Sequence, residues 1–109
     1  MGFFDFLNIP DINQGVEAYR MTPDAVLLDV RMPDEYREGA ISGSKNIPLP
    51  MLEQAGRVIP SESTPVFVYC YSGGRSRKAV EILQQMGYSD VRNIGGIASY
   101  TGELDKTGA

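Results

Sequence analysis

Four apolar runs along the chain predict the strands of a buried sheet. Residues 25–30 and 66–70 are almost continuously apolar, which is typical of strands covered on both faces. Two shorter runs lie at residues 46–47, where Pro48 ends the segment, and at residues 91–94, where two glycines follow. We expect these four runs to form the central sheet.

The segments between these runs show helical spacing. The clearest helix is predicted over residues 76–86, because its apolar side chains fall on one face and Gly87 supplies a stop. Asp11 is a suitable N-cap for a helix that ends at about Arg20. Two short helical segments are predicted at residues 33–37 and 51–56. Strands that alternate with helices in this way indicate an α/β fold with a mainly parallel sheet.

Length and composition favour one soluble domain. The chain has 109 residues, of which 42% are hydrophobic and 22% charged, ordinary values for a globular protein. We therefore expect a single domain over residues 1–109, with residues 1–10 as a loosely packed N-terminal extension. No apolar run approaches the roughly 18 residues of a membrane span, so we predict no membrane segment and expect a cytoplasmic location.

The chain contains one cysteine and no histidine. A single cysteine excludes an intramolecular disulfide, and the lack of histidine excludes a Cys-His dyad and a His-ligated metal. The net charge of −4 argues against a nucleic-acid binder, which usually carries a basic face. We expect no metal and no cofactor. Because the chain has no histidine, any nucleophile must be activated without an imidazole.

Cys70 is the candidate nucleophile, because it ends the predicted strand 66–70, where α/β proteins bind their ligands. The loop after it contains two adjacent glycines, and the predicted helix 76–86 follows. Such a loop lets several backbone N–H groups converge on one anionic atom, and the helix adds the positive end of its dipole. A thiol held at that point is shifted toward the thiolate without any histidine.

Three of the ten basic residues stand at the start of this helix, namely Arg75, Arg77 and Lys78. Cations in a first turn oppose the helix dipole, at a cost of about 0.3–1 kcal/mol each. A thiolate or an anionic substrate would offset this repulsion. The basic cluster therefore supports a functional site at the loop.

The residues from this cysteine onward resemble the active-site loop of the rhodanese-like domain family of sulfurtransferases, with cysteine first, glycine fourth and arginine sixth. They are Cys70, Tyr71, Ser72, Gly73, Gly74, Arg75 and Ser76. Further segments are similar to the other signatures of the family, in the same order: residues 28–36, 39–48 and 95–100. The resemblance implies an α/β fold whose central, mainly parallel sheet has helices on both faces.

The resemblance also implies that Cys70 accepts a sulfane sulfur, becomes a persulfide and passes the sulfur to an external acceptor. Expected donors are thiosulfate, glutathione persulfide or polysulfide, and expected acceptors are cyanide or a thiol such as glutathione or thioredoxin. The backbone amides from Tyr71 to Ser76 would hold the sulfur, and Arg75 would contact an anionic donor. Tyr71 and Ser72 are neutral, where some thiosulfate-preferring members of the family carry basic residues.

Three charged residues near the first predicted strand are interpreted as structural, namely Asp29, Arg31 and Glu35. Arg31 and Glu35 are placed to pair with each other. Their pairing would tie the strand at residues 25–30 to the turn that follows it.

Other functions stay open at this point. A rhodanese fold can also act as a non-enzymatic interaction module or as a persulfide carrier for a partner protein, although modules usually lack the cysteine. Cysteine-dependent phosphatases and arsenate reductases also use a cysteine-headed loop, with five residues between cysteine and arginine. Four residues lie between Cys70 and Arg75, which gives a narrower ring that suits a sulfur atom better than a phosphate.

Overall fold

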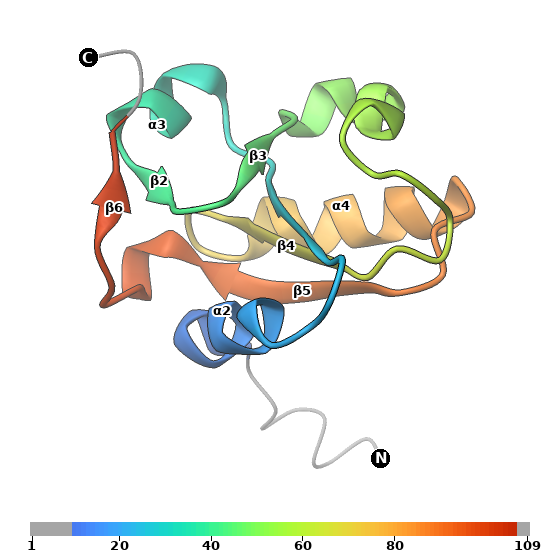
Figure 1. Ribbon diagram of the computed structural model, residues 1–109. Helices are drawn as coiled ribbons and strands as arrows, with labels where there is room; N and C mark the ends of the chain where they lie inside the picture. Colours follow the sequence, from blue (N-terminus) through green and yellow to red (C-terminus); the bar gives the residue numbers. More distant parts are fainter. Residues whose placement is uncertain (1–9, 107–109) are drawn as a thin grey trace, which may run out of the picture.

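Four parallel strands form the central sheet in the order β3-β1-β4-β5 (Figure 1). The structure is a computed structural model that describes residues 10–106, so most of the predicted extension at residues 1–10 lies outside the described residues. The strands are β1 (Val26–Asp29), β3 (Lys45–Asn46), β4 (Val66–Cys70) and β5 (Val91–Gly96). All four predicted strands are present, and the parallel α/β sheet is confirmed.

Helices cover both faces of this sheet. Helix α2 (Ile12–Arg20) packs on one face, against the side chains of Leu27, Phe67, Tyr69 and Ile94. Helix α4 (Gly74–Gln85) and the 3-10 segment η1 (Leu49–Arg57) pack on the other face, against Leu28, Val66, Val68 and Cys70. Side chains alternate along β4, so the thiol of Cys70 belongs to the α4 side of the sheet.

The helix boundaries follow local signals in the sequence. The side chain of Asp11 accepts hydrogen bonds from the backbone N–H groups of Asn13 and Gln14, which confirms it as the N-cap of α2. Helix α3 (Pro33–Glu38) begins at its proline, as predicted. Gly87, just beyond α4, has a φ of +109°, a conformation that favours glycine at a helix end.

Two helical segments begin two residues earlier than predicted. Helix α4 begins at Gly74 because Gly73 adopts a left-handed conformation and acts as its N-cap. The sequence does not indicate this N-cap, because glycine has no side chain that could accept the capping hydrogen bond. Segment η1 begins at Leu49, and Met51 has a non-helical backbone inside it. The predicted helix at residues 51–56 is therefore the later part of a kinked 3-10 segment.

A small second sheet was not predicted. It pairs β2 (Ala40–Ile41) with β6 (Leu104–Asp105) in antiparallel fashion, beside α3 (Figure 1). A short 3-10 turn, η2 (Ile97–Ser99), precedes β6. Elements of two or three residues are too short to show a hydrophobic period.

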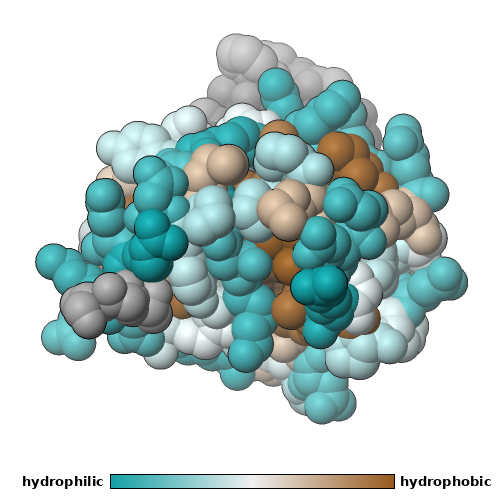
Figure 2. Space-filling model, turned by 90° about the horizontal axis from the view of Figure 1, so that it is seen from above, coloured by the Kyte–Doolittle hydropathy of each residue, from teal (hydrophilic) through white to brown (hydrophobic). Residues whose placement is uncertain are grey.

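Hydrophilic side chains cover most of the face seen in Figure 2, and apolar side chains form only small patches there. Across residues 10–106, no helix combines the length and the apolar character needed to cross a bilayer.

Candidate active site

Cys70 is the last residue of β4, at the carboxyl end of the central sheet. Its side chain is buried, with 1% of the residue exposed. The loop that follows is short, because α4 begins at Gly74. A central strand and the first turn of a helix therefore fix the thiol from both sides.

Two backbone amides donate hydrogen bonds to the sulfur of Cys70. The Gly73 N–H lies 3.0 Å from Sγ and the Ser76 N–H lies 3.3 Å from it. Gly73 has a φ of +101°, and this left-handed turn brings its amide back toward the sulfur. Ser76 lies in the first turn of α4, where backbone N–H groups have no partner inside the helix. The structure thus brings the thiol, the glycine turn and the helix start together.

The electrostatics of the site favour the thiolate. Burial of the thiol opposes ionisation, but hydrogen bonds from the Ser76 hydroxyl and from the Ser76 and Gly73 amides outweigh it and lower the pKa of Cys70. Each of these donors stabilises the charged form more than the neutral form. Activation here needs no imidazole, in agreement with a chain that has none.

The end of β5 supports the loop from behind. Gly96 pairs with Cys70 in the sheet, and a Cβ atom at Gly96 would clash with the backbone of Tyr71 and Ser72. The amide of Ala98 donates to the Tyr71 carbonyl oxygen at 3.0 Å. Glycine at this position therefore lets two backbone segments approach each other closely.

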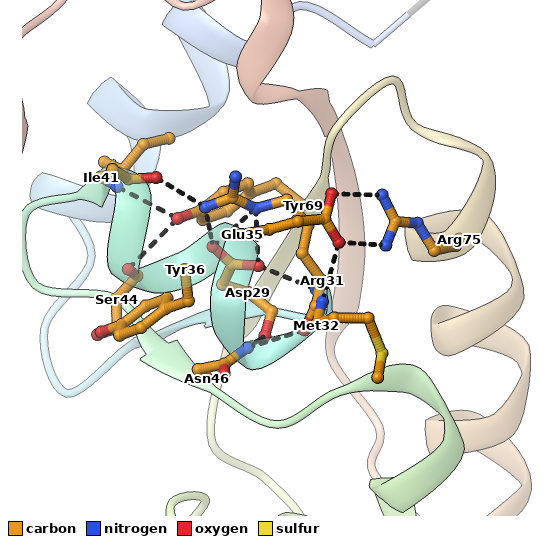
Figure 3. Close-up of polar contacts among 11 residues, drawn as sticks. Asp29, Arg31, Met32, Glu35, Tyr36, Ile41, Ser44, Asn46, Tyr69 and Arg75 are labelled. Carbon is orange, nitrogen blue, oxygen red and sulfur yellow. Dashed lines mark hydrogen bonds and ion pairs between the residues drawn. The ribbon is translucent and has the colours of Figure 1, made fainter. Parts of the chain in front are cut away.

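Arg75 forms a bidentate ion pair with Glu35 of α3 (Figure 3). Its Nη1 and Nη2 atoms lie 2.7 Å and 3.0 Å from the two carboxylate oxygens. This contact with Arg75 is the main cause that lowers the pKa of Glu35 to about 2. The predicted pairing of Glu35 with Arg31 is wrong, because each of the two residues has another partner.

Arg31 pairs instead with Asp29, inside a buried cluster at the end of β1 (Figure 3). Its Nη2 atom lies 2.7 Å from Asp29 Oδ2 and 2.8 Å from the carbonyl oxygen of Gly39. The side-chain amide of Asn46 donates to the carbonyl oxygens of Asp29 and Arg31, at 2.9 Å each. These contacts tie β1, β3 and the start of β2 together.

Asn93 is a site residue that the sequence did not single out. Its side chain connects the loop to β5: Oδ1 lies 2.7 Å from the Ser76 hydroxyl, and Nδ2 donates to the Gly73 carbonyl oxygen at 3.3 Å. The available signal was a polar residue inside the apolar run at residues 91–94. Such a residue in a buried strand usually has a specific hydrogen-bond partner.

Two cavities adjoin the loop. The larger, of about 830 Å³, lies between the loop and the start of α2, and its walls include Ser72, Arg77 and Asn93. The smaller, of about 280 Å³, is lined by Glu35 among other residues. Tyr71 contributes to the walls of both cavities.

Comparisons with known proteins agree on one family. The sequence profile of the rhodanese-like domain matches residues 13–103. The chain is 41% identical over 71 residues to the thiosulfate sulfurtransferase PspE of Escherichia coli, covering 64% of this chain and 68% of that protein. It is 36% identical over 80 residues to a sulfurtransferase of Allochromatium vinosum, covering 72% and 74%. A solved structure, a rhodanese with anions from E. coli, aligns with a TM-score of 0.70 at 36% identity, covering 75% of this chain and 98% of that one.

Proposed function

Because this chain belongs to the rhodanese-like domain family and is a sulfurtransferase, we propose that Cys70 carries sulfane sulfur as a persulfide. The donor is thiosulfate, glutathione persulfide or polysulfide, and the acceptor is cyanide or an external thiol such as glutathione or thioredoxin. The observation that carries the proposal is the convergence of two amides and one hydroxyl on the buried Sγ. This arrangement stabilises negative charge on one sulfur atom.

Sulfur transfer to the protein is a displacement at sulfur. The Cys70 thiolate attacks the outer sulfur of thiosulfate, a new S–S bond forms, and sulfite leaves with the electron pair of the broken S–S bond. In the second step, cyanide or an acceptor thiolate attacks the outer sulfur of the persulfide. The Cys70 thiolate then leaves, and the donors that lowered its pKa make it a better leaving group.

The acceptor must come from outside the chain. A second cysteine could discharge the persulfide as an internal disulfide, but the sequence contains only Cys70. Tyr71 is 55% exposed and lines both cavities, so it is placed to meet an incoming molecule.

Arg75 bears on the choice of donor. Its guanidinium is engaged by both oxygens of Glu35, so a dianionic donor such as thiosulfate would have to compete with a carboxylate for it. An uncharged donor needs no such exchange. Thiosulfate and an uncharged donor should therefore depend differently on this ion pair.

Mass spectrometry of the intact protein tests the proposal. Incubation with thiosulfate, glutathione persulfide or polysulfide should add one sulfur atom, and the Cys70→Ser variant should gain none. Addition of cyanide or glutathione should then remove the sulfur from the wild-type protein.

Three other outcomes would favour the alternatives. No adduct with any donor would leave an interaction module as the better interpretation. An adduct that small acceptors cannot discharge would indicate a carrier for a partner protein. Hydrolysis of a small aryl phosphate that is lost in Cys70→Ser would indicate a phosphatase.

A further inference from the structure

The hydroxyl of Ser76 has one proton and three neighbours that can accept it. Its Oγ lies 2.7 Å from Asn93 Oδ1, 3.1 Å from the Gly73 carbonyl oxygen and 3.4 Å from Cys70 Sγ. Ser76 is fully buried, so no bulk water competes for these contacts. The hydroxyl can therefore donate to the sulfur only when its proton turns away from the other two acceptors.

The orientation of the Asn93 amide is fixed by its other contacts. The Gly95 N–H, a donor, lies 3.0 Å from one atom, which must therefore be the oxygen Oδ1. The Gly73 carbonyl oxygen, an acceptor, lies 3.3 Å from the other atom, which must be Nδ2. Asn93 thus presents an acceptor to Ser76, and the 2.7 Å contact is the shortest that the hydroxyl makes.

We propose that Asn93 is a positioning residue that acts on Cys70 through Ser76, by competing with the sulfur for the Ser76 hydroxyl proton. With a neutral thiol, the hydroxyl donates to Asn93 and accepts from the S–H group. With a thiolate or persulfide anion, the hydroxyl turns and donates to the sulfur. No atom is gained or lost, and the hydroxyl follows the charge of the sulfur through the cycle.

The inference builds on the proposed role of Cys70 as the nucleophile. It concerns the strength of one donor rather than the sulfur transfer itself. Alkylation of the thiolate reports on that donor whether or not any sulfur moves, so the two proposals can fail separately.

The charged groups near the thiol lie on elements other than β5, the strand that carries Asn93. Arg75 of α4 senses the charge of Cys70 and is paired with Glu35 of α3. Asp29, at the end of β1, forms an ion pair with Arg31. A change at Asn93 or Ser76 removes none of these charges, so a shift in the titration of Cys70 cannot come from a lost charge.

The test is the pH dependence of Cys70 alkylation by iodoacetamide, which reports one site because the chain has one cysteine. Ser76→Ala should raise the midpoint pH by about half a unit or more, the worth of one hydroxyl hydrogen bond. Asn93→Ala should lower it by a smaller amount, because the sulfur then competes for the hydroxyl proton with the Gly73 carbonyl oxygen alone. In the Ser76→Ala background, Asn93→Ala should cause no further shift.

Asn13→Ala is the matched control. Asn13 lines the same cavity and loses comparable hydrogen bonds, to Ser99 and Thr101, but it does not contact Ser76. Its midpoint should equal that of the wild type. Asn93 also lines this cavity, so water can reach the groups that Asn93→Ala exposes, and thermal melting will verify that the variant folds.

The proposal is overturned by any of three results. An unchanged or higher midpoint in Asn93→Ala would make the role of Asn93 purely structural. An equal shift with and without the Ser76 hydroxyl would show that Asn93 acts on the loop backbone. A shift in Asn13→Ala of the same size would show that the cavity, and not the hydroxyl, governs the thiol.

Discussion

Two polar clusters lie next to each other at the carboxyl ends of paired strands, and they differ in how their central anion is stabilised. At the end of β1, the Asp29 carboxylate accepts the Arg31 backbone N–H at 2.9 Å and the Arg31 guanidinium at 2.7 Å. At the end of β4, the Cys70 sulfur accepts two backbone amides and faces one hydroxyl. In both, the residues that follow the strand fold back onto its last side chain.

The two clusters differ in the nature of the donors that hold the anion. Arg31 brings a full positive charge to a carboxylate that is itself completely buried, so that carboxylate is committed to one partner. The donors around Cys70 carry only partial charges, which favour the thiolate but leave its lone pairs available for attack. A thiolate held by partial charges is stabilised and can still attack, as the proposed function requires.

The largest expected effect comes from removing the negative charge of Asp29. Asp29→Asn keeps the shape of the side chain but leaves Arg31 buried without a counter-charge, which should cost about 3–5 kcal/mol of unfolding free energy. Urea denaturation measures the loss. The control is Asp90→Asn in the exposed Asp90–Arg92 pair, which should cost less than about 1 kcal/mol. Equal losses would remove the distinction between the buried cluster and an ordinary surface pair.

The next effect should appear at the backbone that supports the reactive loop. Gly96→Ala forces a methyl group into the backbone of Tyr71 and Ser72, which should cost about 1–3 kcal/mol and displace the amides that hold Cys70. Thiosulfate sulfurtransferase activity should fall at least tenfold.

Gly56→Ala is the matched control for that loss. Gly56 lies in η1, outside the loop, and a Cβ atom there meets only the Tyr88 hydroxyl at 3.9 Å, an ordinary contact, so activity should stay close to that of the wild type. If Gly96→Ala is equally active, the close contact with β5 does not position the loop.

The smallest effect should come from Glu35→Gln, which releases Arg75 from its partner. The kcat/KM for thiosulfate should rise about two- to fivefold, as expected for a partly exposed ion pair, and the value for an uncharged organic trisulfide should not change. Steady-state kinetics with both donors measures the difference. Equal changes for both donors would mean that Arg75 only positions the loop.

The same variant has a pH signature. The folded-state pKa of Glu35 is lowered from 4.5 to about 2, so its ion pair stabilises the folded protein above pH 4.5 and ceases to do so as the pH falls through about 2. Since both side chains are about one-third exposed, the stabilisation is below about 1 kcal/mol. Urea denaturation should show a constant stability difference between wild type and Glu35→Gln above pH 4.5, and this difference should shrink as the pH falls toward 2.

The elements that the sequence predicted well are those with strong local signals. The strand at residues 66–70 was predicted with its observed bounds, because it is a continuous apolar run that follows a proline. The loop was found because a cysteine, two glycines and a helix start fall within a few residues. Local chemistry of this kind needs no knowledge of distant partners.

The partners of charged side chains could not be predicted in the same way. Glu35 meets Arg75 across 40 residues of chain, and no local period encodes such a contact. The sequence predicts a pair between Arg31 and Glu35, yet the buried carboxylate of Asp29 binds Arg31, since an unpaired buried charge costs more than an exposed one. The strands β2 and β6 depend on each other in the same long-range manner.

Most of the donors around the Cys70 sulfur are main-chain atoms. The groups that stabilise the sulfur therefore differ from the side chains that an incoming molecule would meet. Tyr71 and Ser72 are exposed and line the large cavity, while the amides of Gly73 and Ser76 face the sulfur. Substitution of these two residues would therefore change the walls of the cavity and leave the amide donors in place. In the proposed function, the molecules that dock at the loop can thus change while the groups that stabilise the sulfur stay the same.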